Sequence, residues 1–463
     1  MILVPDLLYR DDAFYSGLAL EFDENTGRIE RVLHQLEIGD AAAMRLPGRA
    51  LMPGFVNAHS HSFQRLIRGR TQWRPSRYGA SDFWSWRSSM YAAVLDMSPD
   101  ALYDVARFCF LEMLKAGYTT VGEFHYLQRD PSGAAYANPN ELGSRIISAA
   151  TSVGIRICLL NVCYARGGIN EPLQPEQRRF ATPDVDAFIH ATESLAEAAV
   201  GDPLTTVGMA PHSLRAVPRE WLPALHDWAA ARDVPFHMHV AEQPAEVHAC
   251  IDAYGMRPME LLSLDGILDD HFTAIHGTHL DDRELRMFGD ARASVCLCPT
   301  TERDLGDGLA RIEDLADARA SLCMGTDSQS VIDPFEELRL IEYHERLRLL
   351  RRVVLSRPHA REQRHETPPF LLSIGTIGGA NALRLSAGAF ESGMTADFIA
   401  IDLEHPSLAG WQLDSLAALV TMSAPSSVVR DVWVNGVQRV TEGHHDAEHE
   451  IHTAYRAAAE QNR

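Results

Sequence analysis

The chain has 463 residues, of which 46% are hydrophobic and 23% are charged, as in a globular protein with a large core. Its formal net charge of −21 argues against nucleic acid or an anionic membrane as partners. The sequence has no apolar run of transmembrane length, no secretion signal at its start and only seven cysteines, so we expect a cytoplasmic protein without disulfides.

Residues 1–50 predict short strands and turns, with candidate strands at 17–22 and 29–33. An apolar run at 51–56 then predicts a buried strand that leads into His59-Ser60-His61. Residues i and i+2 of a strand share a face, so the two imidazoles can point at one metal ion. Two hydrogen-bonded core histidines are the other interpretation of this pair.

An aromatic-rich segment follows the first strand, at residues 71–91. Such a segment can form a lid over an active site, pack on the rest of the chain or contact a second subunit. Its aromatic residues are Trp73, Tyr78, Phe83, Trp84, Trp86 and Tyr91.

Residues 51–380 alternate strand-like and helix-like stretches, and eight such units predict a (β/α)8 barrel. Besides the strand that leads to His59, the predicted strands are 119–124, 156–161, 206–210, 235–240, 273–276, 293–298 and 322–325. Helices are predicted between them, for example at 102–116, 185–199 and 219–232. Cys296 and Cys298, on the seventh strand, are expected to be small core residues.

The C-terminal part, residues 381–463, is again rich in predicted strands. One is predicted at 397–402, and Asn435-Gly436 within 432–440 is a strong signal for a type I′ hairpin turn. We expect the two β-rich ends of the chain to pair into one small sandwich beside the barrel. The polar, histidine-rich tail from residue 443 predicts an exposed terminal helix rather than a metal site.

Ligand-type side chains end further barrel strands, where such barrels carry their active sites. The fifth strand ends in His237-Met238-His239 and is followed by Glu242, the sixth ends in His276, and Asp327 follows the eighth. A catalytic zinc has three or four protein ligands and a position open to water. We therefore predict a site for one divalent metal ion, with the ligands His59, His61, His239 and Asp327.

Position along the fifth strand decides the roles of His237, His239 and Glu242. His237 shares a face with His239 and competes for the ligand role, but His239 is nearer to the end of the strand. Glu242 can reach a substrate without binding the metal. His276 and Asp327 can both contact the attacking water.

The motifs at residues 53–61, 239–242, 276–277 and 325–327 resemble the amidohydrolase superfamily, most closely its branch of single-metal deaminases. The resemblance extends over nearly the whole chain. Several members of the superfamily bridge two metals through a carboxylated lysine on the fourth strand. Lys115 is the only lysine and lies on a predicted helix before the second strand, so this bridge is excluded.

Within that branch, the motifs at residues 59–65, 83–87, 122–126, 211–215 and 325–329 are similar to those of formimidoylglutamate deiminases. The resemblance implies hydrolysis of N-formimino-L-glutamate to N-formyl-L-glutamate and ammonia, a step of histidine degradation. It also implies that the substrate is contacted by Gln64, Arg87, Tyr126, His212 and Arg215.

The chemistry of such a substrate agrees with these residues. Arginine binds a carboxylate through two parallel hydrogen bonds, so Arg87 and Arg215 in barrel loops suit a small anionic amidine; a surface position is the alternative for either. In the predicted reaction His276, with Asp327, accepts the proton of water, and Glu242 protonates the leaving nitrogen.

Other interpretations stay open. A deaminase of purine or pterin rings would rely on aromatic stacking rather than on two carboxylate clamps. The missing bridging lysine counts against a hydrolase of cyclic amides, and the filled ligand positions count against a non-catalytic barrel. The ligand set suits zinc, iron or manganese, of which we predict zinc, and we expect a homodimer because it is the commonest oligomer.

Overall fold

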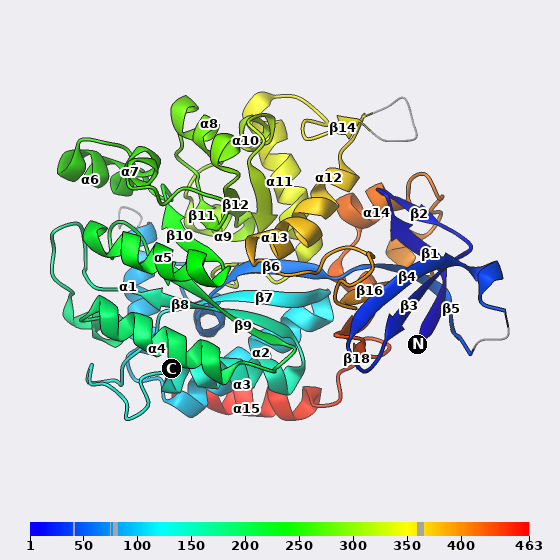
Figure 1. Cartoon of the computed structure of the whole chain (residues 1–463), viewed down its shortest axis with the longest axis horizontal. Helices are drawn as coiled ribbons and strands as arrows, with labels where there is room; N and C mark the ends of the chain where they lie inside the picture. Colours follow the sequence, from blue (N-terminus) through cyan, green and yellow to red (C-terminus); the bar gives the residue numbers. More distant parts are fainter. Residues whose placement is uncertain (40–41, 75, 77–81, 359–364, 463) are drawn as a thin grey trace.

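Most of the chain forms a barrel of parallel strands surrounded by helices (Figure 1). The structure is a computed structural model and describes residues 1–39, 42–74, 76, 82–358 and 365–462. Within these residues, eight strands pair with one another in chain order around the barrel, which confirms the predicted (β/α)8 architecture. They are β6 (Phe55–Ser60), β7 (Tyr118–His125), β8 (Arg156–Cys163), β9 (Thr205–Pro211), β10 (Phe236–Val240), β11 (Phe272–His276), β12 (Ser294–Leu297) and β13 (Ser321–Met324).

The barrel closes where the segment that follows β13 meets the end of β6. The Asp327 N–H donates to the His59 carbonyl and the His61 N–H donates to the Asp327 carbonyl, both at 3.0 Å. Gly325 makes this approach possible, because a Cβ at that position would lie 2.7 Å from the His59 Cβ. Closure of the barrel therefore brings Asp327 beside both histidines of the first strand.

Helices cover the outside of the barrel, and the predicted helices are present with small shifts of their ends. The helix predicted at 102–116 begins earlier, because the Ser98 side chain caps it by accepting from the Ala101 N–H, and it ends at Gly117 with φ 104°. The main helices are α1 (Phe83–Val94), α2 (Pro99–Ala116), α3 (Glu141–Val153), α4 (Val185–Ala198), α5 (Leu222–Arg232), α6 (Pro244–Tyr254), α7 (Pro258–Leu264), α8 (Asp282–Ala291), α9 (Pro299–Leu305), α10 (Ile312–Asp317), α11 (Pro334–Leu349), α12 (Pro368–Ser373), α13 (Gly379–Ala382), α14 (Leu416–Ser423) and α15 (Glu448–Gln461).

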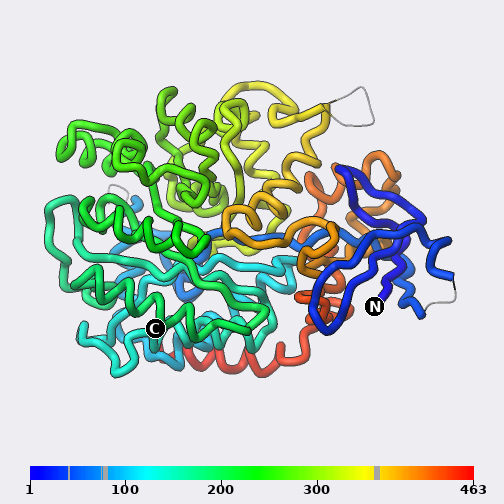
Figure 2. Tube along the Cα trace, viewed as in Figure 1, coloured from blue at the N-terminus to red at the C-terminus, as the bar shows by residue number. Residues whose placement is uncertain are grey.

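The two ends of the chain meet in a second sheet beside the barrel, as Figure 2 shows for the blue and the orange-to-red parts of the tube. Its strands hydrogen-bond as one continuous sheet in the order β18-β17-β16-β5-β1-β3-β4, with β2 paired to β1. They are β1 (Ile2–Arg10), β2 (Ala13–Tyr15), β3 (Leu18–Asp23), β4 (Arg28–His34), β5 (Met44–Pro53), β16 (Phe398–Asp402), β17 (Val429–Val434) and β18 (Val437–Val440). The pairing of both ends confirms the predicted second β domain.

The strand predicted over 51–56 is two strands in the structure. β5 runs to Pro53 in the second sheet and β6 begins at Phe55 in the barrel, with Gly54 between them. A Cβ on Gly54 would come within 2.2 Å of the Thr119 side chain, so only glycine fits this change of sheet. The chain thus enters the barrel at Gly54, three residues after the predicted start of the barrel domain at residue 51. The predicted domains, 1–50, 51–380 and 381–463, otherwise stay a prediction.

The C-terminal elements follow the sequence patterns. Asn435 and Gly436 connect β17 to β18 with φ values of 53° and 74°, as a type I′ turn requires. The tail forms α15, which packs on α2, where Glu448 pairs with Lys115. The only lysine is thus held on a helix outside the barrel. None of the helices in the described ranges combines the length and apolar character needed to cross a bilayer.

Candidate active site

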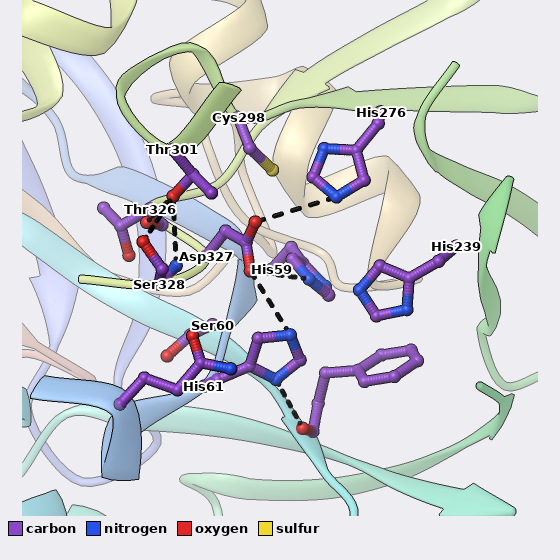
Figure 3. Close-up of polar contacts among 12 residues, drawn as sticks. His59, Ser60, His61, His239, His276, Cys298, Thr301, Thr326, Asp327 and Ser328 are labelled. Carbon is purple, nitrogen blue, oxygen red and sulfur yellow. Dashed lines mark hydrogen bonds and ion pairs between the residues drawn. The ribbon is translucent and has the colours of Figure 1, made fainter. Parts of the chain in front are cut away.

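The four side chains predicted as metal ligands lie together at the ends of β6, β10 and β13 (Figure 3). Their ligand atoms are all within 4.8 Å of one another, and all four residues are buried. His59 Nε2 and His61 Nε2 lie 3.5 and 3.3 Å from Asp327 Oδ1. Three imidazoles and one carboxylate at these separations can hold a divalent metal ion.

The hydrogen bonds of these histidines leave one ring nitrogen free for a metal. His61 Nδ1 donates to the Phe124 carbonyl at 2.9 Å, and His239 Nδ1 donates to the His212 carbonyl at 3.0 Å. Each bond selects the tautomer whose Nε2 carries a lone pair toward the group. His59 is fully buried, and neither of its ring nitrogens has a hydrogen-bond partner within the described part of the chain. An ion in this group would satisfy His59 Nε2, the ring nitrogen that faces Asp327.

The charges of the group also suit a cation. Burial lowers the pKa of His59 to about 3 and holds the pKa values of His61 and His239 below the ordinary value, so the imidazoles are neutral. Burial alone would raise the pKa of Asp327, but His59, His61 and His276 lower it below its ordinary value. Metal ligation requires these protonation states.

His237, the competing ligand candidate, points elsewhere. Its Nε2 donates to the Ala382 carbonyl at 2.8 Å, and the side chain is not part of the ligand group. The position nearer to the strand end, His239, is the one that reaches the group.

His276 and Glu242, the predicted acid–base residues, lie beside the ligand group. His276 Nε2 is 3.6 Å from Glu242 Oε1 and 3.6 Å from Asp327 Oδ2. Burial raises the pKa of Glu242 to about 7; burial lowers that of His276, but Glu242 and neighbouring carboxylates raise it to about 10. His276 and Asp327 have φ values of 73° and 50°, a strained backbone of the kind found at functional sites.

One pocket contains all five predicted substrate contacts and opens onto the ligand group through His61, His239 and Asp327. Within it, the Gln64 amide donates to the Tyr126 hydroxyl at 2.9 Å. The predicted contacts that line this pocket are Gln64, Arg87, Tyr126, His212 and Arg215.

The aromatic segment supplies part of the pocket wall. Three residues of α1 line the pocket: Phe83, Trp86 and Tyr91. Their position supports the interpretation of the aromatic segment as a lid over the active site. A contact with a second subunit stays an untested alternative, and Tyr78 lies outside the described residues.

Both pocket arginines have buried N–H groups that nothing in the described ranges accepts. These are Nη1 of Arg87 and both Nε and Nη1 of Arg215. The Arg87 guanidinium lies 4.5 Å from the Trp84 ring centroid, which holds it without using its donors. Burial lowers the pKa of Arg87, and the nearby charge of Arg215 lowers it further. Two adjacent cations with free donors match an anion with carboxylate groups.

Residues 50–439 of the chain match the amidohydrolase family, which is most of its length. The chain belongs to the amidohydrolase family. The resemblance seen in the strand-end motifs is thereby confirmed.

Individual relatives agree with this assignment. This amidohydrolase is 36% identical over 409 residues to the formimidoylglutamate deiminase of Pseudomonas aeruginosa, with 87% of each chain covered. The crystal structure of an amidohydrolase from Brucella melitensis is similar with a TM-score of 0.88 and 32% identity, over 100% of this chain and 99% of that one. An adenosine deaminase from Xanthomonas campestris with bound zinc shares the fold, with a TM-score of 0.83 and 22% identity over 100% of this chain and 98% of that one.

Sequence reasoning missed several residues of this amidohydrolase site. Glu302 Oε1 lies 3.3 Å from His276 Nδ1, and burial raises the pKa of Asp307, near Glu242, to about 9. Tyr164, just after β8, lines the pocket. Glu302 stands in the first turn after the seventh strand, where attention to strand-end polar residues could have found it. Asp307 lies in a loop, which no periodic pattern predicts.

Proposed function

We propose that this amidohydrolase hydrolyses N-formimino-L-glutamate to N-formyl-L-glutamate and ammonia, a step in histidine degradation. The observation that carries the proposal is the pair of buried arginines, Arg87 and Arg215, with free donors in the pocket that reaches the ligand group. The substrate offers two carboxylates to them and a cationic amidine to Glu242 and Asp327. The relative from Pseudomonas aeruginosa, which is named for this activity, supports the same substrate.

The residues of the site have complementary tasks in this reaction. The three histidines and Asp327 would hold a divalent ion, which would supply Lewis acidity that promotes ionisation of water. His276 loses its proton beside such a cation because like charges repel, and then accepts the proton of the attacking water together with Asp327. The water oxygen bonds to the formimino carbon, and Glu242 delivers a proton to the terminal nitrogen. The bond from carbon to that nitrogen then breaks, the oxygen gives up its remaining proton to form the formyl carbonyl, and ammonia leaves.

We further propose that the ion is zinc, that the enzyme is cytoplasmic and that it is a homodimer. The ligand set suits zinc, and the adenosine deaminase with the same fold holds zinc. All seven cysteines are free thiols in the structure, as a reducing compartment favours. The oligomer is the commonest case for soluble enzymes and is checked by light scattering.

Ammonia release from a panel of substrates tests the proposal. We expect kcat/KM for N-formimino-L-glutamate to exceed that for adenosine or a pterin by about 100-fold or more, because both arginines stay unpaired with an uncharged ring. The aromatic wall of Phe83, Trp86 and Tyr91 favours ring stacking and makes a ring deaminase the second candidate. Faster turnover of an aromatic ring would reject our choice.

The contact between Arg215 and a substrate carboxylate is tested by substitution. We expect Arg215→Gln to lower kcat/KM by about 10–100-fold, mainly through KM, because a hydrogen bond to a charged group contributes about 1.5–3 kcal/mol. Arg219→Gln is the matched control, since Arg219 pairs with Asp265 and stays out of the pocket. On a formimino amine that lacks the carboxylate bound by Arg215, wild type and variant should become equal. An unchanged kcat/KM for N-formimino-L-glutamate would contradict the contact.

A further inference from the structure

A second group of potential ligand atoms lies beside the first and shares Asp327 with it. His276, Cys298 and Asp327 place one donor atom each within 4.8 Å of one another, and all three residues are buried. Figure 3 shows the Cys298 sulfur near the Asp327 carboxylate, with the His276 ring on the other side. Cys298 is a buried core residue, as predicted, and it also directly follows β12 at the active site.

His276 is oriented for a second role. Its Nδ1 lies 3.3 Å from Glu302 Oε1, while its buried Nε2 has no hydrogen-bond partner among the described residues and faces Asp327. A carboxylate that holds the far nitrogen of a histidine is the usual support of a metal-bound imidazole. The same Glu302 oxygen accepts the Cys298 N–H at 2.9 Å, so one side chain positions two of the three donors.

Asp327 faces the two groups with different oxygens. Its Oδ1 lies 3.5 and 3.3 Å from His59 and His61, whereas its Oδ2 lies 3.6 Å from His276. A carboxylate in this arrangement can bridge two cations. Glu242 Oε1, also 3.6 Å from His276 Nε2, is available as a fourth donor.

Charge and size permit a second cation. The buried carboxyl groups of Glu242, Glu302, Asp307 and Asp327 lie near His276, so the neighbourhood is rich in acidic groups. Zinc bonds of about 2.3 Å to sulfur and about 2.0 Å to nitrogen place two such donors about 3.5 Å apart in a tetrahedral site. The three donor atoms lie within 4.8 Å of one another, so side-chain shifts of about 1 Å bring them to bonding distance.

We propose that His276, Cys298 and Asp327 form a second binding position for a thiophilic divalent ion, such as Zn²⁺ or Cd²⁺ in excess, and that its occupation inhibits the enzyme. Thiolate and imidazole donors favour these ions over magnesium or calcium. Binding forms a metal–sulfur bond, and the thiol proton passes to solvent. The ion also takes the Nε2 lone pair of His276, which the reaction needs to accept a proton from water.

Binding is tested by titrating the zinc-loaded enzyme with Cd²⁺ and recording ultraviolet thiolate-to-cadmium absorption. The first ligand group contains no sulfur, so replacement of its zinc by cadmium produces no such band. We expect the band to saturate at one Cd²⁺ per chain in wild type and in Cys323→Ala, a buried thiol on the neighbouring strand. The band should be absent in Cys298→Ala and in Cys298→Ser, which keeps the side-chain shape. A band of equal size without Cys298, or no band in wild type, would overturn the proposal.

Inhibition is tested by the ratio of activity in excess metal to activity with one equivalent of zinc. We expect at least about 10-fold more metal for half-inhibition of Cys298→Ala than of wild type or Cys323→Ala, and a similar shift for Glu302→Gln. Equal inhibition in all four proteins would reject the inhibitory role. This measurement rests on the proposed function, whereas the absorption measurement does not. A chain that binds Cd²⁺ through Cys298 but leaves N-formimino-L-glutamate intact would refute the function alone.

Discussion

Replacing His239 by alanine should remove most of the bound metal and lower kcat for N-formimino-L-glutamate by about a thousandfold or more. The side chain supplies one of the four donors in the ligand group, and its Nε2 is free because Nδ1 donates to the His212 carbonyl. Loss of the ion removes several kcal/mol of transition-state stabilisation, which is about 10³-fold or more in rate. Metal content per folded chain and steady-state kinetics measure the two effects.

His237→Ala is the matched control for this variant. Both histidines are buried on β10, but His237 donates to the Ala382 carbonyl and lies outside the ligand group. Its loss should lower thermal stability, because a buried carbonyl then lacks its partner, yet leave the metal content near wild type. If His237→Ala lost the metal and His239→Ala retained it, our choice of ligand would be wrong.

The ligand group could be anticipated from the sequence because two simple geometries act together. Alternation along a strand places His59 and His61 on one face, and a parallel barrel gathers all strand ends at one rim. Asp327 could be placed beside them without knowledge of any loop, since closure of the barrel pairs its backbone with both histidines. The predicted helices and the hairpin at Asn435 followed from equally local rules.

Other features depend on contacts that no local pattern encodes. The boundary at Gly54 follows from its close approach to Thr119, a residue distant in sequence. Glu302 lies in the first turn after the seventh strand, but its hydrogen bond to His276 at the end of the sixth strand is visible only in the fold. Cys298 has the pattern of a core cysteine and is also buried, so its nearness to Asp327 becomes visible only in three dimensions.

Replacing Glu242 by glutamine should lower kcat by about 10²–10⁴-fold while the metal content stays at the wild-type level. Glutamine keeps the size and one hydrogen-bonding oxygen of the side chain but cannot carry a proton to the leaving nitrogen. Burial raises the pKa of Glu242 to about 7, which suits a group that must both take up and release a proton near neutral pH. Glu242 is not among the four grouped ligands, so the ion should remain.

Glu246→Gln separates this role from a general effect of removing a buried charge. Glu246 is also buried, and it accepts the Glu242 N–H at 3.2 Å, but it does not line the pocket. We expect its loss to change kcat by less than about tenfold, since it touches no reacting atom. Equal losses in both variants would mean that the charge of the region matters rather than proton transfer by Glu242. Turnover retained by Glu242→Gln with full metal content would assign the proton transfer to another group, such as His276, whose Nε2 lies 3.6 Å from Glu242 Oε1.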